Sequence, residues 1–128
     1  MVKDPKFFIC KICGNIALKV VDSGVNMVCC GQQMQELVAN TVEASYEKHL
    51  PVIEYDNGDI VIKVGGEAHP MLPEHYITWI VIQTEKGYQI KYLNPGESPQ
   101  AKFRLSDDDK LVAAYEYCNL HGLWKTKA

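Results

Sequence analysis

Four of the five cysteines lie near the start of the chain, at spacings that suit a metal site. Cys10 and Cys13 form a C-x2-C pair, and the adjacent residues Cys29 and Cys30 follow after fifteen intervening residues. Four thiolates suit tetrahedral zinc or iron. Because the side chains of adjacent residues diverge, Cys29 and Cys30 should widen one angle at the metal and distort the site.

The residue types alone leave other roles open for these cysteines. A structural zinc knuckle uses the same four thiolates. Two disulfides would suit an oxidising compartment better than the cytoplasm. A thioredoxin-like redox pair needs a surrounding βαβ pattern, which is missing around Cys10 and Cys13. We therefore expect a bound zinc or iron ion.

The four histidines and the fifth cysteine lie in the rest of the chain. A single histidine is more often a surface or core residue than a ligand. His49 lies in an expected loop before the first strand there, and His69 and His75 enclose a loop that contains two prolines. Cys118 and His121 are three residues apart, so that a tight turn can direct both at one ion, with Nδ1 of His121 as the favoured donor. These five residues form a second candidate metal site.

Four imidazoles and one thiolate are too many ligands for tetrahedral zinc. Five ligands suit iron with one open position, and a thiolate opposite that position would push electron density onto the metal. A cupredoxin copper site also combines a β-sandwich with a similar loop, but it needs a methionine soon after the histidine. Gly122, Leu123 and Trp124 follow His121 instead.

The elements that position these residues are expected to be β-strands. Short strands are predicted over residues 7–10, 15–21 and 25–29, joined by turns. A segment of about 36 residues buries too little apolar surface to fold alone, so the cysteines must stabilise it through a metal. Residues 37–42 contain no Gly or Pro and predict an ordered connector.

Seven short strands separated by turn residues are predicted in the remainder. They cover residues 52–55, 59–64, 76–84, 88–93, 101–105, 111–117 and 123–125. Asp56-Asn57-Gly58 between the first two is a hairpin signal. The pattern predicts an all-β fold: a small metal-stapled domain (1–36), a connector (37–42) and an immunoglobulin-like seven-stranded β-sandwich (43–128).

Composition and charge exclude several classes of protein. The chain is 47% hydrophobic and 23% charged, with a net charge of −3, which argues against a nucleic-acid partner. It contains no apolar run of 18 residues, so no membrane span is predicted. Residues 1–11 lack the apolar stretch of a signal peptide. We expect a cytoplasmic protein whose thiols stay reduced.

The motifs resemble a known family over nearly the whole chain. The first segment is similar to desulforedoxin in its four cysteines, its fifteen-residue gap and Gly14. The remainder is similar to the superoxide reductase domain in four motifs: EKHLPV at 47–52, AHPM at 68–71, HYITW at 75–79 and CNLHGLWK at 118–125. Together these segments resemble desulfoferrodoxin, the two-iron superoxide reductase family.

The resemblance implies an oxidoreductase that detoxifies superoxide under oxidative stress. Superoxide would be reduced by one electron to hydrogen peroxide, without release of oxygen. The resemblance implies two irons per chain, one bound by Cys10, Cys13, Cys29 and Cys30, and a catalytic one bound by His49, His69, His75, His121 and Cys118.

The resemblance also implies roles for two residues beside His49 and for two partners. Lys48 would draw in superoxide and order water, and Glu47 would bind the open position once the iron is oxidised. Electrons would come from a small carrier such as rubredoxin, and the chain would form a homodimer. Whether the four-cysteine iron relays electrons or is structural stays open. A zinc-binding module, a closed electron carrier and a dismutase are the alternative functions.

Overall fold

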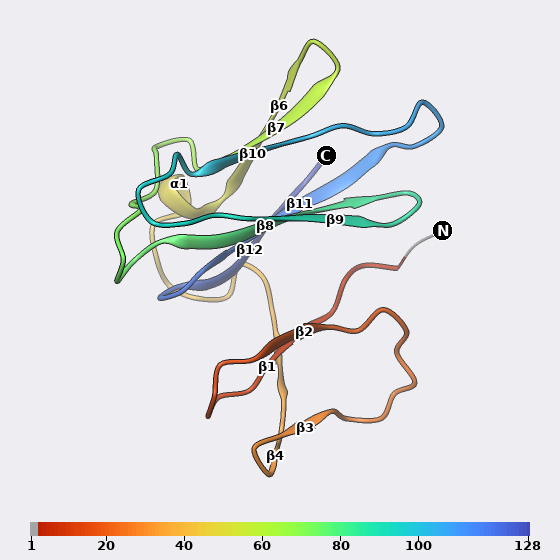
Figure 1. Cartoon of the computed structure of the whole chain (residues 1–128), viewed down its shortest axis with the longest axis vertical. Coiled ribbons are helices and arrows are strands. Elements are labelled where there is room, and N and C mark those ends of the chain that lie inside the picture. The colour runs from red at the N-terminus through yellow and green to blue at the C-terminus, as the bar shows by residue number, and fades with distance from the viewer. Residues whose placement is uncertain (1–2) are drawn as a thin grey trace. The chain divides into compact units, whose positions relative to one another are not determined.

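The protein is built almost entirely of β-strands (Figure 1). The computed structural model describes residues 3–128, which fold into two compact units, residues 3–38 and 39–128. The predicted connector, residues 37–42, spans the boundary between them. Met1 and Val2, which the predicted first domain includes, lie outside the described residues. The predicted all-β fold class is confirmed.

The N-terminal unit contains five short strands. A three-stranded antiparallel sheet has β1 (Phe7–Ile9) at its centre, with β2 (Ile16–Leu18) and β5 (Gln35–Leu37) on its two sides. A separate hairpin pairs β3 (Val28–Cys29) with β4 (Gln32–Gln33). Each strand has only two or three residues, so hydrogen bonding rather than a large apolar face defines them.

The strand predictions for this unit were correct only in part. Those over 7–10 and 15–21 correspond to β1 and β2. The prediction over 25–29 is wrong except for its last two residues, and β4 and β5 were not predicted. Within the unit only Phe7 and Cys10 are fully buried. A core this small cannot stabilise a domain by itself.

The C-terminal unit is a β-sandwich of seven strands in two antiparallel sheets, as predicted. One sheet has the order β10-β7-β6 and the other β12-β11-β8-β9. Their bounds are β6 (Pro51–Asp56), β7 (Asp59–Val64), β8 (Ile77–Thr84), β9 (Tyr88–Tyr92), β10 (Gln100–Phe103), β11 (Leu111–Cys118) and β12 (Gly122–Lys127).

Alternating apolar residues of both sheets form the core of the sandwich. Ile62 on β7 and Ile80 and Ile82 on β8 are fully buried there. The predicted hairpin joins β6 and β7 through Asn57 and Gly58, whose φ angles of 50° and 86° match the type I′ turn that suits the twist of two strands.

One short helix interrupts the β-structure. The segment before the first sandwich strand was expected to be a loop, but α1 (Tyr46–His49) forms one helical turn. The side chain of Ser45 caps its start by accepting a hydrogen bond from the Lys48 amide at 3.4 Å. Pro51 ends it, because the residue before a proline disfavours the helical conformation. A helix of four residues is too short to show a helical period in the sequence.

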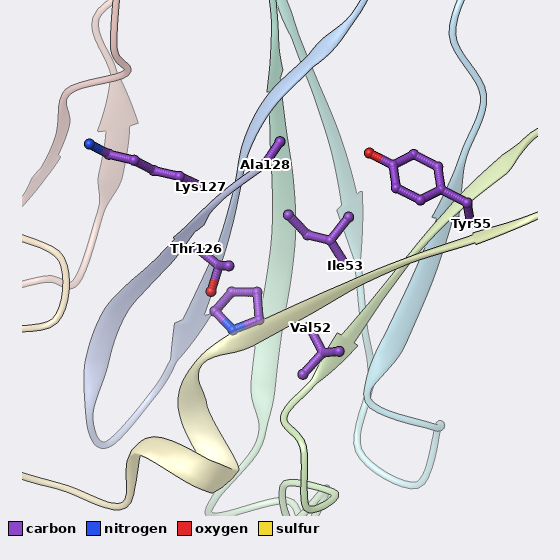
Figure 2. A pocket seen from close by; sticks show the side chains of 7 residues that line it. Val52, Ile53, Tyr55, Thr126, Lys127 and Ala128 are labelled. Atoms are coloured by element: carbon purple, nitrogen blue, oxygen red, sulfur yellow. The ribbon is translucent and has the colours of Figure 1, made fainter.

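A shallow hollow lies beside the edge strands β6 and β12 (Figure 2). It is lined by Pro51, Val52, Ile53, Tyr55, Thr126, Lys127 and Ala128. None of the predicted site residues lies in it. Among residues 3–128, no helix has the length and apolar character needed to cross a membrane.

The sandwich core predicts a clear difference between buried and exposed isoleucines. Replacing Ile80, which is fully buried, with alanine should lower the free energy of unfolding of the sandwich by about 2–5 kcal/mol, because it leaves a cavity. Ile90→Ala is the matched control, since Ile90 is 49% exposed. Urea unfolding at equal iron content, followed by the fluorescence of Trp79 and Trp124, measures both. Equal losses would contradict this account of the core.

Candidate metal centres

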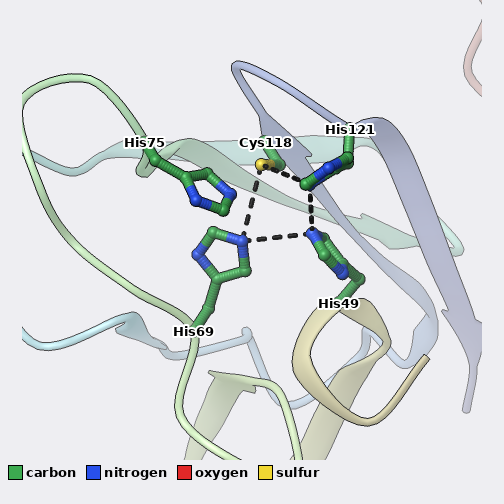
Figure 3. A group of neighbouring side chains, drawn as sticks. All are labelled: His49, His69, His75, Cys118 and His121. Carbon is green, nitrogen blue, oxygen red and sulfur yellow. Dashed lines mark hydrogen bonds between the residues drawn. The ribbon is translucent and has the colours of Figure 1, made fainter. Parts of the chain in front are cut away.

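Five side chains from three segments meet beside the sandwich and form what we call the histidine–cysteine cluster (Figure 3). His49 comes from α1, and His69 and His75 come from the loop between β7 and β8. Cys118 is the last residue of β11, and His121 lies in the turn between β11 and β12. Each offers one donor atom, and the five atoms lie within 4.8 Å of one another. The cluster brings together all five residues that the sequence placed in one site.

Hydrogen bonds to main-chain carbonyls fix the tautomers of two of these histidines. Nδ1 of His49 lies 2.7 Å from the carbonyl oxygen of Ser45, and Nδ1 of His69 lies 2.7 Å from that of Pro70. A carbonyl oxygen only accepts, so both Nδ1 atoms carry the proton and both Nε2 atoms carry a lone pair. These two Nε2 atoms are 3.1 Å apart. Two facing lone pairs repel at this distance, and a cation between them removes the repulsion.

The other members of the cluster complete this donor set. Nδ1 of His121 lies 3.1 Å from Nε2 of His49, and Sγ of Cys118 lies 3.5 Å from Nε2 of His69. Nε2 of His75 is buried and has no hydrogen-bond partner among the described residues. A buried polar atom without a partner is costly. Four imidazole nitrogens and one thiolate therefore fit an iron ion.

Burial favours the neutral form of three of the imidazoles, which is the form that binds a metal. Removal from water lowers the pKa values of His49 and His75, and it lowers the pKa of His69 to about 4. Burial also raises the pKa of Cys118, although the backbone amides of Leu120 and His121 oppose this. The thiolate form of Cys118 needs a nearby cation to be stable at neutral pH.

A second acidic group lies close to Cys118 in the sequence. Glu116 is fully buried on β11, and its carboxyl oxygens have no partner among the described residues. Burial raises its pKa well above the usual value, which favours the neutral form of the group. A negative charge on Glu116 would raise the pKa of Cys118 further, so the neutral form is the one that suits a thiolate at Cys118. The sequence analysis did not identify this residue.

Trp124 supports two members of the cluster at once. Its ring is fully buried and stacks on that of His49 with 4.9 Å between the centroids, and its Nε1 donates to the His121 carbonyl at 3.1 Å. Neither interaction could be inferred from the sequence, although Trp124 follows His121 by three residues. Trp124 thus links α1 to the turn between β11 and β12.

Gly65 allows the loop after β7 to pack against α1. A methyl group there would overlap the carbonyl oxygen of Glu47 and lie 3.1 Å from that of Leu50. The same loop donates a hydrogen bond from the Glu67 amide to the Glu47 carbonyl at 3.1 Å. This close approach packs the loop that leads to His69 against the helix that carries His49. The sequence analysis did not identify it.

The four cysteines of the N-terminal unit form the second cluster. Their sulfur atoms lie within 4.8 Å of one another, with 3.6 Å between Sγ of Cys13 and Sγ of Cys29, and all four are free thiols. Asn15 donates a hydrogen bond to Cys29 Sγ at 3.6 Å, and the Cys13 amide donates one to Cys10 Sγ at 3.5 Å. The φ of +52° at Cys30 lets the adjacent pair turn toward one point.

The crowding of these thiols also favours a cation. The Cys13 backbone hydrogen bond lowers the pKa of Cys10 to about 6. Hydrogen bonding to Cys13 raises the pKa of Cys30 to about 12, and it also raises that of Cys29. Several thiolates cannot share this small volume unless a metal ion neutralises them. The four sulfurs therefore fit a tetrahedral iron.

The two predicted catalytic residues lie on α1. Lys48 is half-buried, and its charge adds to the effect of burial in lowering the pKa values of His49 and His75. Glu47 is exposed. Its carbonyl oxygen accepts the bond from the Glu67 amide.

Comparison with known proteins identifies the family. The desulfoferrodoxin family model matches residues 41–127, and that of the desulfoferrodoxin N-terminal domain matches residues 4–37. The chain belongs to the desulfoferrodoxin family. It is 44% identical over 128 residues to the desulfoferrodoxin of Syntrophotalea carbinolica, with 99% of each chain covered.

Solved structures agree with this membership. The crystal structure of the superoxide reductase from Treponema pallidum superposes with a TM-score of 0.82 at 38% identity, covering 98% of this chain and 100% of that one. The one-iron superoxide reductase from Giardia intestinalis gives 0.53 at 30% identity and covers 64% of this chain and 97% of that one. The similarity to the Treponema pallidum protein therefore extends over both units of the chain.

The close approach at Gly65 predicts a specific loss of iron. Gly65→Ala should displace α1 and weaken iron binding at the histidine–cysteine cluster by about tenfold or more, because metal sites depend on the orientation of their ligands. Gly66→Ala is the matched control, since its methyl group would lie 3.9 Å from the Glu47 oxygen. Iron per chain is measured after gel filtration. Full iron content in both variants would contradict the role of Gly65.

Proposed function

We propose that the histidine–cysteine cluster binds the catalytic iron of this superoxide reductase, and that Cys10, Cys13, Cys29 and Cys30 bind its second iron. The protein reduces superoxide to hydrogen peroxide by one electron and carries two irons per chain. The observation that carries the assignment is the pair of unprotonated imidazole nitrogens 3.1 Å apart, surrounded by three further donors.

The reaction takes up one electron and two protons for each superoxide. When bound, the iron supplies the electron and an open position for a small anion. With four neutral imidazoles and one thiolate, the ferrous centre has a net single positive charge, which favours an anionic substrate. The burial of Cys118 keeps water away from its sulfur.

Lys48 and Glu47 are proposed to act on the substrate side of the cluster. A fixed positive charge on Lys48 attracts the anion and stabilises the negative charge that develops as the electron arrives. Its ammonium group also holds water from which protons can reach the product. Glu47 is proposed to occupy the open position after oxidation, so that it acts as a gate and must move before the next superoxide binds.

The remaining proposals concern domains, partners and compartment. Residues 1–36 would form the four-cysteine iron domain, 37–42 the connector and 43–128 the catalytic domain. Each turnover consumes an electron, so an external donor is required, and a small carrier such as rubredoxin is proposed. A homodimer is proposed because Val20, Val21 and Val25 are each at least 71% exposed. Five free thiols favour the reducing cytoplasm.

Product stoichiometry tests the proposed function directly. The iron-loaded protein with a reductant chain should form one hydrogen peroxide per superoxide and no oxygen. Half as much peroxide, with oxygen, would indicate a dismutase. A zinc-binding module would contain zinc and no iron, and a closed electron carrier would not bind azide or cyanide. Either of these would leave superoxide consumption at background.

Lys48→Ala should slow the reaction with superoxide at low salt by about tenfold or more and reduce its dependence on ionic strength, because the local positive charge is lost. Iron content should stay unchanged. Pulse radiolysis measures the bimolecular rate. Lys110→Ala is the control, because it removes the same charge far from the cluster. Lys110 lies next to one end of the paired strands β8 and β11, and Cys118 lies at the other end. An unchanged rate in Lys48→Ala would exclude this role.

A further inference from the structure

We propose that Asn119 is a positioning residue that holds the main chain on both sides of His75 and joins it to the turn that carries Cys118 and His121. This inference rests on the proposed role of the histidine–cysteine cluster and extends it to a residue that touches neither iron nor substrate.

Asn119 makes hydrogen bonds to both neighbours of His75. Its side-chain Nδ2 donates to the carbonyl oxygen of Glu74 at 3.0 Å, and its Oδ1 accepts from the amide of Tyr76 at 2.9 Å. Its own amide donates to the Tyr76 carbonyl at 3.2 Å. All three distances fall in the ordinary range for hydrogen bonds. The residues before and after His75 are therefore tied to one side chain and its backbone.

His75 depends on its main chain for orientation more than two other histidines of the cluster do. Ring hydrogen bonds from Nδ1 to carbonyl oxygens orient His49 and His69. The described residues give the ring of His75 no such bond, and its Nε2 is buried without a partner. Its backbone pairs with Leu72, within the same loop, at 2.9 and 3.0 Å. The Asn119 side chain ties this loop to the opposite ligand-bearing turn.

The regular strand pairing is interrupted where Asn119 acts. β8 and β11 pair up to Tyr117 opposite Trp79, and the register then shifts before Cys118 pairs with Ile77. The side-chain amide of Asn119 continues the hydrogen bonding beyond this irregularity, as a backbone amide would in a ladder. Only a short side chain with one donor and one acceptor can satisfy both Glu74 and Tyr76 at once.

Asn119 is exposed, which makes the proposal testable without damage to the core. Asn119→Ala removes both side-chain bonds. Asn119→Asp keeps an acceptor for the Tyr76 amide but places an oxygen against the Glu74 carbonyl oxygen. Leu120→Ala is the control, because Leu120 is the next residue, is 59% exposed and supplies only its backbone near Cys118.

The experiment follows iron loss from the full two-iron chain into a chelator, with the two irons distinguished by their absorption and electron paramagnetic resonance spectra. The histidine–cysteine iron should leave about tenfold faster in Asn119→Ala than in the unchanged chain, with Asn119→Asp in between. The four-cysteine iron of the same molecule is an internal reference and should leave at an unchanged rate. The spectrum of the histidine–cysteine iron should change in Asn119→Ala, while the midpoint of urea unfolding of the sandwich should not.

Each outcome has one meaning. Equal loss of the histidine–cysteine iron from the unchanged chain and both Asn119 variants overturns the proposal, as does equal acceleration for both irons or in Leu120→Ala. If Asn119→Ala does not fold, the comparison of Asn119→Asp with Leu120→Ala decides. Failure of the unchanged chain to bind iron at the histidine–cysteine cluster would instead contradict the proposed function.

Discussion

The repulsion between two imidazole lone pairs, on Nε2 of His49 and Nε2 of His69, is the constraint on which the catalytic unit depends. Carbonyl oxygens accept from the other nitrogen of each ring, so neither pair can relax by a change of tautomer. Burial opposes protonation, because it lowers both pKa values. With a change of tautomer and protonation both disfavoured, a bound cation is the remaining way to remove the repulsion between the two lone pairs.

The two units rely on metal to different degrees. The sandwich has a continuous apolar core around Ile62 and Ile80. Of the metal ligands this core includes Cys118, and Met71 of the loop between His69 and His75 packs against it. The N-terminal unit buries only Phe7 and Cys10 completely. Its four thiols therefore supply through a metal the stability that its core lacks. Iron in the sandwich orders loops on a scaffold that is already stable, whereas iron in the N-terminal unit is part of what folds it.

Features that depend on residues close together in the sequence could be predicted from it. The sandwich strands show alternation and turn residues such as Asn57-Gly58, and the ligand candidates show recognisable spacings, so the all-β fold and two groups of metal-binding residues could be predicted. Helix α1, β4 and β5 are too short to show a period. Gly65 and Trp124 act through contacts with segments distant in sequence, and the burial of Glu116 depends on packing, so no local pattern indicates them.

The net charge of the chain makes the charge close to the iron decisive. With a net charge of −3, the whole protein repels an anion, but salt screens that repulsion beyond about 8 Å at physiological ionic strength. Within that distance the imidazoles carry no charge when they bind the iron, so Cys118 compensates only part of its positive charge. Burial favours the neutral form of Glu116, which would otherwise add a second negative charge. Lys48 then adds a positive charge beside the cluster. For an acidic protein, the attraction of an anion to the iron depends on this local balance of charge more than on the net charge of the chain.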